Sequence, residues 1–192
     1  MQPAKPFLVI VCGLTGSGKS TLARELAKRL GMPVINSDAV RKQIAGNVGK
    51  NLVPFESGIY SQAMTEKTYA RMADLAEKHI LSGEGAILDA TFSRRANREK
   101  ILELAGRHTI LLVVIRCFAS EETTRNRLAK RLAQGMDISD GRWEIYQRQK
   151  EAYEPMEEIP SAARLELNTA EPVEDLVRRV EKFLLRIRQP TA

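Results

Sequence analysis

The feature that most constrains the fold is an apolar run, Phe7–Val11, that leads directly into the sequence CGLTGSGKST at residues 12–21. The run has no polar face, which is typical of a strand buried on both sides of a sheet. Within the second sequence, Gly13 is followed by four residues and then by Gly18-Lys19-Ser20. Leucines then recur every four residues up to Leu30, which predicts a helix over 19–30. A strand, a glycine-rich turn and a helix therefore follow one another.

This order predicts a cradle for phosphate groups. Glycine accepts positive φ, so the N–H groups of the turn can point at one anion, and the helix adds the positive end of its dipole. Lys19 supplies a charge for the β- and γ-phosphates, and the Ser20 hydroxyl is a ligand for Mg²⁺. Guanine-specific folds usually carry an NKxD string, which this sequence lacks, so we expect ATP. The predicted nucleotide-binding residues of the cradle are Gly13, Leu14, Thr15, Gly16, Ser17, Gly18, Lys19, Ser20 and Thr21.

Further apolar runs alternate with helical patterns along the chain. We expect strands at 34–38, 85–91, 109–118 and 164–168, and helices at 61–82, 95–105, 120–134, 140–153 and 172–187. Strands that are apolar on both faces and separated by helices predict an α/β protein. The expected fold is that of a P-loop NTPase, a five-stranded parallel sheet with helices on both faces, and the fully apolar 109–118 strand should be central. We expect one domain over 1–192, with a helical lid at about 120–155.

Composition sets wider limits on the class of protein. The chain has 192 residues, of which 43% are hydrophobic, and a net charge of +6, which suits an anionic ligand or nucleic acid but also an ordinary basic surface. Its longest apolar runs are far shorter than the roughly 20 residues that span a bilayer. Cys12 and Cys117 lie far apart in apolar runs, which favours reduced core thiols. We therefore expect a cytoplasmic protein without a membrane partner; the sequence gives no oligomeric state.

Two charged residues follow the second predicted strand, in the sequence INSDAVRKQI at 35–44. Asp38 stands at the end of the strand and Arg41 one helical turn later, so both side chains can face one cleft. A kinase needs a carboxylate that accepts or orients the proton of the acceptor hydroxyl, and a guanidinium can fix an anionic group beside it. The spacing leaves a second interpretation open, in which Asp38 only caps a helix at 39–45.

Three sequences, GLTGSGKST, INSDAVRKQI and AILDATFSRRANREKI, together resemble the small P-loop kinases of the polynucleotide 5′-kinase group. Gluconate kinases, zeta toxins and chloramphenicol phosphotransferases are relatives of that group. Over nearly its whole length the chain bears an even closer resemblance to uncharacterised AAA-type ATP-binding domains that are often fused to aminoglycoside-phosphotransferase-like domains. The resemblance implies that Asp38 is the general base and that Arg41 contacts a phosphate of the acceptor.

The third predicted strand ends in LDATFSRRANR at 88–98, which brings Asp89, Thr91 and Arg94 to the same edge of the sheet. The resemblance implies that this element lines the acceptor site. Asp89 has an alternative role, which is to hold Mg²⁺ through a water molecule. For the arginines of this segment the alternative is a solvated helix face, on which Arg95 forms an exposed pair with Glu99.

Two arginines of the predicted lid, Arg127 and Arg131, lie in TRNRLAKRLAQG at 124–135. They resemble the lid arginines of the polynucleotide kinases. Phosphoryl transfer spreads negative charge over the γ-phosphate oxygens, and an arginine delivered by a lid can stabilise that charge. The resemblance assigns this catalytic role to Arg131 and a nucleotide contact to Arg127. A solvated basic helix face is again the alternative.

The expected function is therefore an ATP- and Mg²⁺-dependent phosphotransferase acting on an acceptor hydroxyl, in the first place the 5′-hydroxyl end of a nucleic acid. Two alternatives stay open at this point. One is a small-molecule kinase for a sugar acid, nucleoside, antibiotic or activated sugar. The other is a regulatory module that binds and slowly hydrolyses nucleotide.

Overall fold

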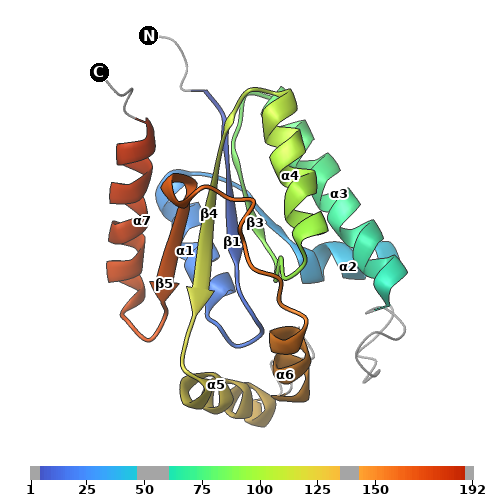
Figure 1. The fold of residues 1–192 in the computed structure, drawn as a ribbon, viewed down its shortest axis with the longest axis vertical. Helices are drawn as coiled ribbons and strands as arrows, with labels where there is room; N and C mark the ends of the chain where they lie inside the picture. The colour runs from blue at the N-terminus through green and yellow to red at the C-terminus, as the bar shows by residue number, and fades with distance from the viewer. Residues whose placement is uncertain (1–4, 47–60, 135–142, 189–192) are drawn as a thin grey trace.

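The computed structural model describes residues 5–46, 61–134 and 143–188. Its core is a five-stranded parallel sheet with the strand order β2-β3-β1-β4-β5 (Figure 1). The strands are β1 (Phe7–Cys12), β2 (Val34–Asn36), β3 (Ala86–Asp89), β4 (Leu111–Phe118) and β5 (Arg164–Asn168). The predicted parallel α/β sheet is confirmed. The central strand is β1 and not β4, which lies between β1 and β5.

Helices connect successive strands of this sheet, and a last helix follows β5. They are α1 (Lys19–Leu30), α2 (Ser37–Ala45), α3 (Gln62–Leu81), α4 (Arg95–Arg107), α5 (Glu121–Gln134), α6 (Trp143–Glu151) and α7 (Val173–Arg188). Ser120 caps α5, as predicted, because its hydroxyl accepts a hydrogen bond from the Thr123 N–H. α4 continues through Gly106, where the sequence predicted its end. Residues 135–142 of the predicted lid lie outside the described residues.

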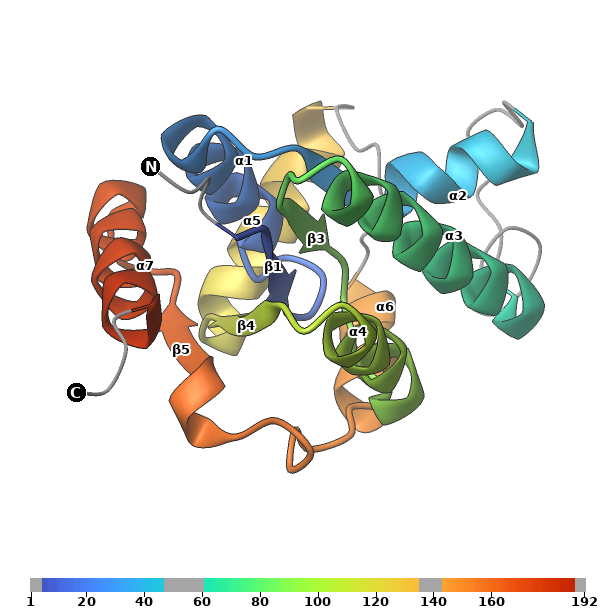
Figure 2. The same ribbon diagram turned by 90° about the horizontal axis from the view of Figure 1, so that it is seen from above.

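Helices cover the sheet on both faces because successive side chains of a strand point to opposite sides. Along β1, Leu8, Ile10 and Cys12 pack in a cluster with residues of α3 and α4. Phe7, Val9 and Val11 pack on the other side, in a cluster with residues of α1 and α7. Figure 2 shows α1 and α7 on one side of the sheet and α3 and α4 on the other. These two apolar clusters fix the sheet on which the site is built.

The glycine-rich turn joins β1 to α1 at the carboxyl ends of the strands, the end of the sheet where α5 and α6 also lie (Figure 1). Gly13 has φ 146°, and a Cβ there would lie 2.3 Å from the carbonyl oxygen of Cys117. The turn must therefore begin with glycine, since β4 passes directly beside it. Among the described residues, no helix is both long enough and apolar enough to cross a membrane.

Candidate active site

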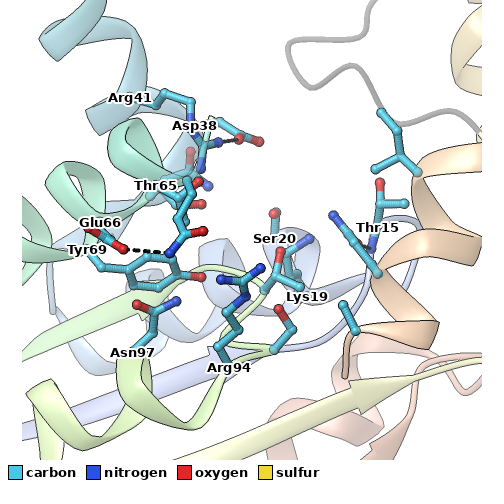
Figure 3. Close-up of a pocket in the computed structure, with 18 of the residues that line it drawn as sticks. Thr15, Lys19, Ser20, Asp38, Arg41, Thr65, Glu66, Tyr69, Arg94 and Asn97 are labelled. Atoms are coloured by element: carbon cyan, nitrogen blue, oxygen red, sulfur yellow. Dashed lines mark hydrogen bonds and ion pairs between the residues drawn. The ribbon is translucent and has the colours of Figure 1, made fainter. Parts of the chain in front are cut away.

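A cavity of about 360 Å³ opens where the glycine-rich turn, α2, α3, α4 and α6 meet (Figure 3). The turn and the start of α1 form one wall, with Lys19 and Ser20, and the helices form the others. In Figure 3, Lys19, Ser20 and Arg94 lie between Thr15 on one side and Asp38 and Tyr69 on the other. The lining includes these residues predicted from the sequence: Thr15, Gly16, Gly18, Lys19, Ser20, Asp38, Arg41, Thr91, Arg94 and Arg131.

The glycine-rich turn is supported by the loop after β5. The Thr169 hydroxyl donates to the Ser17 carbonyl at 2.7 Å, and Arg127 donates to the Thr169 hydroxyl at 2.9 Å. A Cβ on Gly18, which has φ 82°, would meet the Thr169 hydroxyl at 3.0 Å. Burial, and then the charge of Arg131, lower the pKa of Arg127. Arg127 thus supports the turn and is not among the residues that line the cavity, and its predicted contact with the nucleotide stays a prediction.

Asn36, the last residue of β2, caps α2. Its side-chain oxygen accepts from the Ala39 N–H at 3.0 Å, so the interpretation of Asp38 as the helix cap is wrong. Asp38 lies inside the first turn, where its Oδ1 atom accepts from Arg41 Nη1 at 3.1 Å. Arg41 is 9% exposed, and both side chains line the cavity. The end of β2 therefore supplies a carboxylate and a guanidinium to the cavity that also contains Lys19.

Asp89, at the end of β3, does not line the cavity. Its side chain is buried at 2% exposure, and its Oδ2 atom accepts from Asn36 Nδ2 at 2.8 Å. Its Oδ1 atom is buried with no hydrogen-bond partner among the described residues. Direct contact with an acceptor in the cavity, the role predicted first, does not fit this burial. The unsatisfied oxygen fits the alternative, because it can accept a hydrogen bond from a water molecule.

The loop that carries Thr91 and Arg94 is fixed by buried groups. Phe92 has φ 48°, and its N–H donates to the Tyr69 hydroxyl at 3.0 Å. Burial raises the pKa of Tyr69 to about 12, so this phenol stays neutral. Arg98, which has no exposed side-chain surface, donates to the carbonyl oxygens of Phe92 and Pro155.

Arg98 also forms an ion pair with Glu158. The interpretation of a solvated helix face is therefore wrong for Arg98. It holds for Arg95, whose exposed side chain pairs with Glu99 at 2.7 Å. Arg98 joins the loop after β3 to the segment that follows α6.

Several polar side chains of α3, α4 and α6 that line the cavity were missed by sequence reasoning. On α3 these are Gln62, Thr65, Glu66 and Tyr69; on α4 they are Asn97 and Lys100; on α6 it is Gln149. Each stands in an ordinary amphipathic helix pattern, which gives no signal for a functional face. Only the polar residues inside RRANREK, which follow a predicted strand end, could have suggested Asn97 and Lys100.

The residues around the turn fit a magnesium ion. No group of three or more His, Cys, Asp or Glu in the described ranges could hold a metal by itself. A nucleotide-bound Mg²⁺ needs no such cage, because phosphates and water supply most of its ligands. Ser20 lines the cavity and offers a hydroxyl, and Asp89 Oδ1 has unused accepting capacity for a metal-bound water.

Comparison with known proteins gives matches over much of this chain. The model of a family described as AAA domain matches residues 8–156. An uncharacterised protein of Mycobacterium tuberculosis is 32% identical over 141 residues, which are 72% of this chain and 28% of that protein. The 2-phosphoglycerate kinase of Methanococcus vannielii is 37% identical over 81 residues, which are 41% of this chain and 26% of that kinase. The chain thus spans about a quarter of the length of these two relatives.

Solved kinase structures share the fold. The structure of a gluconokinase from Sinorhizobium meliloti superposes with a TM-score of 0.63, covering 97% of this chain and 95% of that one. The two sequences are 21% identical, so this likeness concerns the architecture. The fold predicted from the alternating strands and helices is therefore that of small P-loop kinases.

Proposed function

Because this chain belongs to the AAA domain family, we propose that it is an ATP-dependent kinase that phosphorylates a hydroxyl group of a small anionic molecule. The observation that carries the proposal is the Asp38–Arg41 pair, which lines the same cavity as Lys19 and Ser20. A module that only binds nucleotide has no need of a carboxylate and a guanidinium on the wall opposite the glycine-rich turn. The kinase names of several relatives and fold neighbours support the same class.

In the proposed reaction, the acceptor oxygen forms a bond to the γ-phosphorus, and the bond from that phosphorus to the bridging oxygen of ADP breaks. Asp38 orients the acceptor hydroxyl and takes its proton. Lys19 and the main-chain N–H groups of the turn hold the phosphates, and Arg131 offsets charge on the transferred group. Bound Mg²⁺, held by Ser20 and indirectly by Asp89, would neutralise phosphate charge. Positioning and charge compensation supply most of the rate.

The proposed acceptor class follows from the charges of the cavity. Besides Lys19 and Arg131, three cationic side chains line it, namely Arg41, Arg94 and Lys100. Such groups bind phosphate or carboxylate. The relative named 2-phosphoglycerate kinase has a small anion in its name, as does the gluconokinase. These names favour a small acceptor over the 5′-hydroxyl end of a nucleic acid, which the sequence resemblance put first. The nucleic acid end remains the second candidate, because the same cationic side chains can bind a nucleic acid phosphate.

A transfer screen with γ-labelled ATP tests the proposal. The acceptors are phosphorylated and carboxylated small hydroxy compounds, nucleosides, and 5′-hydroxyl DNA and RNA oligomers, with Lys19→Ala as the blank. We expect labelled product with a small anion and little dependence on salt. Product with oligomers alone, lost steeply as salt rises, would establish the nucleic acid acceptor instead. Hydrolysis without any labelled acceptor would support the regulatory module.

The Asp38→Asn variant separates the chemistry from nucleotide binding. Removal of a general base lowers transfer by about 10²–10⁴-fold, while the affinity for ATP should stay within about twofold. Asp74→Asn is a matched control, because Asp74 is exposed on α3 and does not line the cavity. Transfer by Asp38→Asn at the wild-type rate would contradict the assignment of the base.

A further inference from the structure

Helix α6 contacts the phosphate-binding turn through one side chain. The Thr15 N–H donates to the Oε1 atom of Gln149 at 2.8 Å, across a sequence separation of 134 residues. Thr15 is 7% exposed, and both residues line the cavity. In Figure 3, Thr15 lies on the side of the cavity along which α6 runs. One main-chain N–H group of the glycine-rich turn is therefore already hydrogen-bonded to a carboxamide oxygen.

Helix α6 is joined in turn to α5. The guanidinium carbon of Arg125 lies 4.3 Å from the centre of the Trp143 ring, and Trp143 stacks on Tyr146 with ring centres 4.8 Å apart. Lys150 forms an ion pair with Glu121 at 2.5 Å. A shift of α6 therefore reaches α5, the helix that carries Arg131 into the cavity.

One N–H group can donate a full hydrogen bond to one acceptor at a time. An anionic phosphate oxygen is a stronger acceptor than a neutral carboxamide oxygen. A phosphate oxygen that arrives at the Thr15 N–H must therefore displace the oxygen of Gln149. Thr15 lies in the glycine-rich turn and lines the cavity together with Gly16, Gly18 and Lys19. Main-chain N–H groups of such a turn are the groups that bind phosphate oxygens.

We propose that Gln149 is a positioning residue through which α6 responds to the γ-phosphate of ATP. The inference rests on the proposed function, because it requires ATP in the cradle. Without a γ-phosphate, Gln149 holds α6 to the turn. When a γ-phosphate is bound, the Thr15 N–H donates to a phosphate oxygen instead of to Gln149. Helix α6, together with α5 and Arg131, then takes a new position over the cavity.

The chain contains its own probe for this change. Trp143 is the single tryptophan of the sequence, and it begins α6. The experiment titrates the full chain with Mg·ADP and with Mg·AMPPNP, a non-hydrolysable ATP analogue, and records Trp143 emission and the heat of binding. In the wild type we expect both nucleotides to bind, with an emission change that differs between them, because only AMPPNP brings a γ-phosphate.

Two variants give opposite expectations. Gln149→Met removes the competing oxygen, so AMPPNP should bind more tightly relative to ADP, by about fivefold for one ordinary hydrogen bond. The difference in Trp143 emission should disappear. Gln149→Glu places a charged acceptor at the same N–H and repels the phosphate, so the ratio should move the other way by a similar or larger factor. A merely structural role would move both variants in one direction.

Gln147→Met is the matched control, because Gln147 is an exposed residue of the same type on the same helix. It should behave as the wild type. The inference is overturned if the wild type binds both nucleotides with the same Trp143 response, or if the two Gln149 variants shift the AMPPNP-to-ADP affinity ratio in the same direction. A wild type with no heat of binding for either nucleotide would overturn the proposed function itself.

Discussion

The Nη1 atom of Arg41 lies 3.1 Å from Oδ1 of Asp38, one helical turn away on α2, and both side chains line the cavity that contains Lys19. The pair is available to a ligand because Asn36, and not Asp38, caps the helix. The end of one short strand thus supplies both the cap that starts α2 and, two residues later, a carboxylate that faces the cavity. The pair is the basis of the first prediction.

Replacement of Arg41 by Met should lower transfer by about 10–100-fold, because hydrogen bonds to charged groups contribute roughly 1.5–3 kcal/mol. Most of the loss should appear as a raised KM for an anionic acceptor, since the other wall of the cavity is the proposed ATP site. Steady-state kinetics with the acceptor found by the transfer screen measure the effect. Arg71→Met, at an exposed position of α3, is the control. A raised KM for ATP alone would contradict the assignment.

Ser20→Ala should raise the Mg²⁺ concentration that gives half-maximal activity by about tenfold, because the variant removes the hydroxyl that is the proposed direct ligand of the metal. Ser20→Thr, which keeps the hydroxyl, should restore the wild-type value. Activity measured across a Mg²⁺ titration at fixed ATP provides the comparison. Equal metal requirements in the wild type and in Ser20→Ala would remove Ser20 from the proposed metal site.

Stability should depend on pH through the buried Arg98–Glu158 pair, whose side chains are 0% and 6% exposed. Burial opposes the charge of Glu158, but hydrogen bonds from Arg98 and from a main-chain N–H outweigh it and lower the pKa of Glu158 below 4.5. A lowered pKa in the folded state contributes stability that is present above pH 4.5 and is lost as pH falls through the folded value.

Glu158→Gln leaves the charge of Arg98 uncompensated, which should cost about 3–5 kcal/mol at pH 7. Thermal melts of both proteins between pH 3 and 7 check the prediction. The difference in Tm between wild type and variant should be largest at neutral pH and should shrink below pH 4.5. A difference that stays constant with pH would mean that Glu158 contributes through packing rather than charge.

The two cysteines should be unreactive in the folded protein. Cys12 has no exposed surface and Cys117 is 2% exposed, and burial raises the pKa of Cys12 to about 12. At pH 8 the thiolate fraction of Cys12 is then about 10⁻⁴. Treatment with iodoacetamide followed by mass spectrometry should find both thiols unmodified in the native protein and both modified in guanidinium. Rapid modification of either in the native state would contradict the burial.

The sequence predicted the parts of the fold that local patterns determine. Helix α1 and strand β5 have the predicted bounds, because leucine spacing, a terminal glycine and a run of alternating side chains are local signals. The cap of α2 was not predicted, because Asn36 and Asp38 are equally good capping residues and only the end of β2 decides between them.

The roles of some residues in and around the site could not be predicted from the sequence, because their side-chain partners are distant in sequence. Arg98 stands among other arginines in RRANR, but it is buried because Pro155 and Glu158, nearly 60 residues away, receive its hydrogen bonds. Gln149 lies in a polar helix without any motif, and only its contact with Thr15 distinguishes it from Gln147. Contacts between segments distant in sequence therefore distinguish residues that composition and spacing alone cannot tell apart.

The phosphate cradle is supported by Thr169 and Arg127, which come from the β5 side of the sheet, whereas Asp38, Glu66 and Lys100 come from the opposite side of β1. Under the proposed function, the groups that support the ATP site and those proposed to bind the acceptor therefore come from different stretches of chain on the two sides of β1. Exchange of α2 to α4 should then change the acceptor preference while the support of the glycine-rich turn is kept.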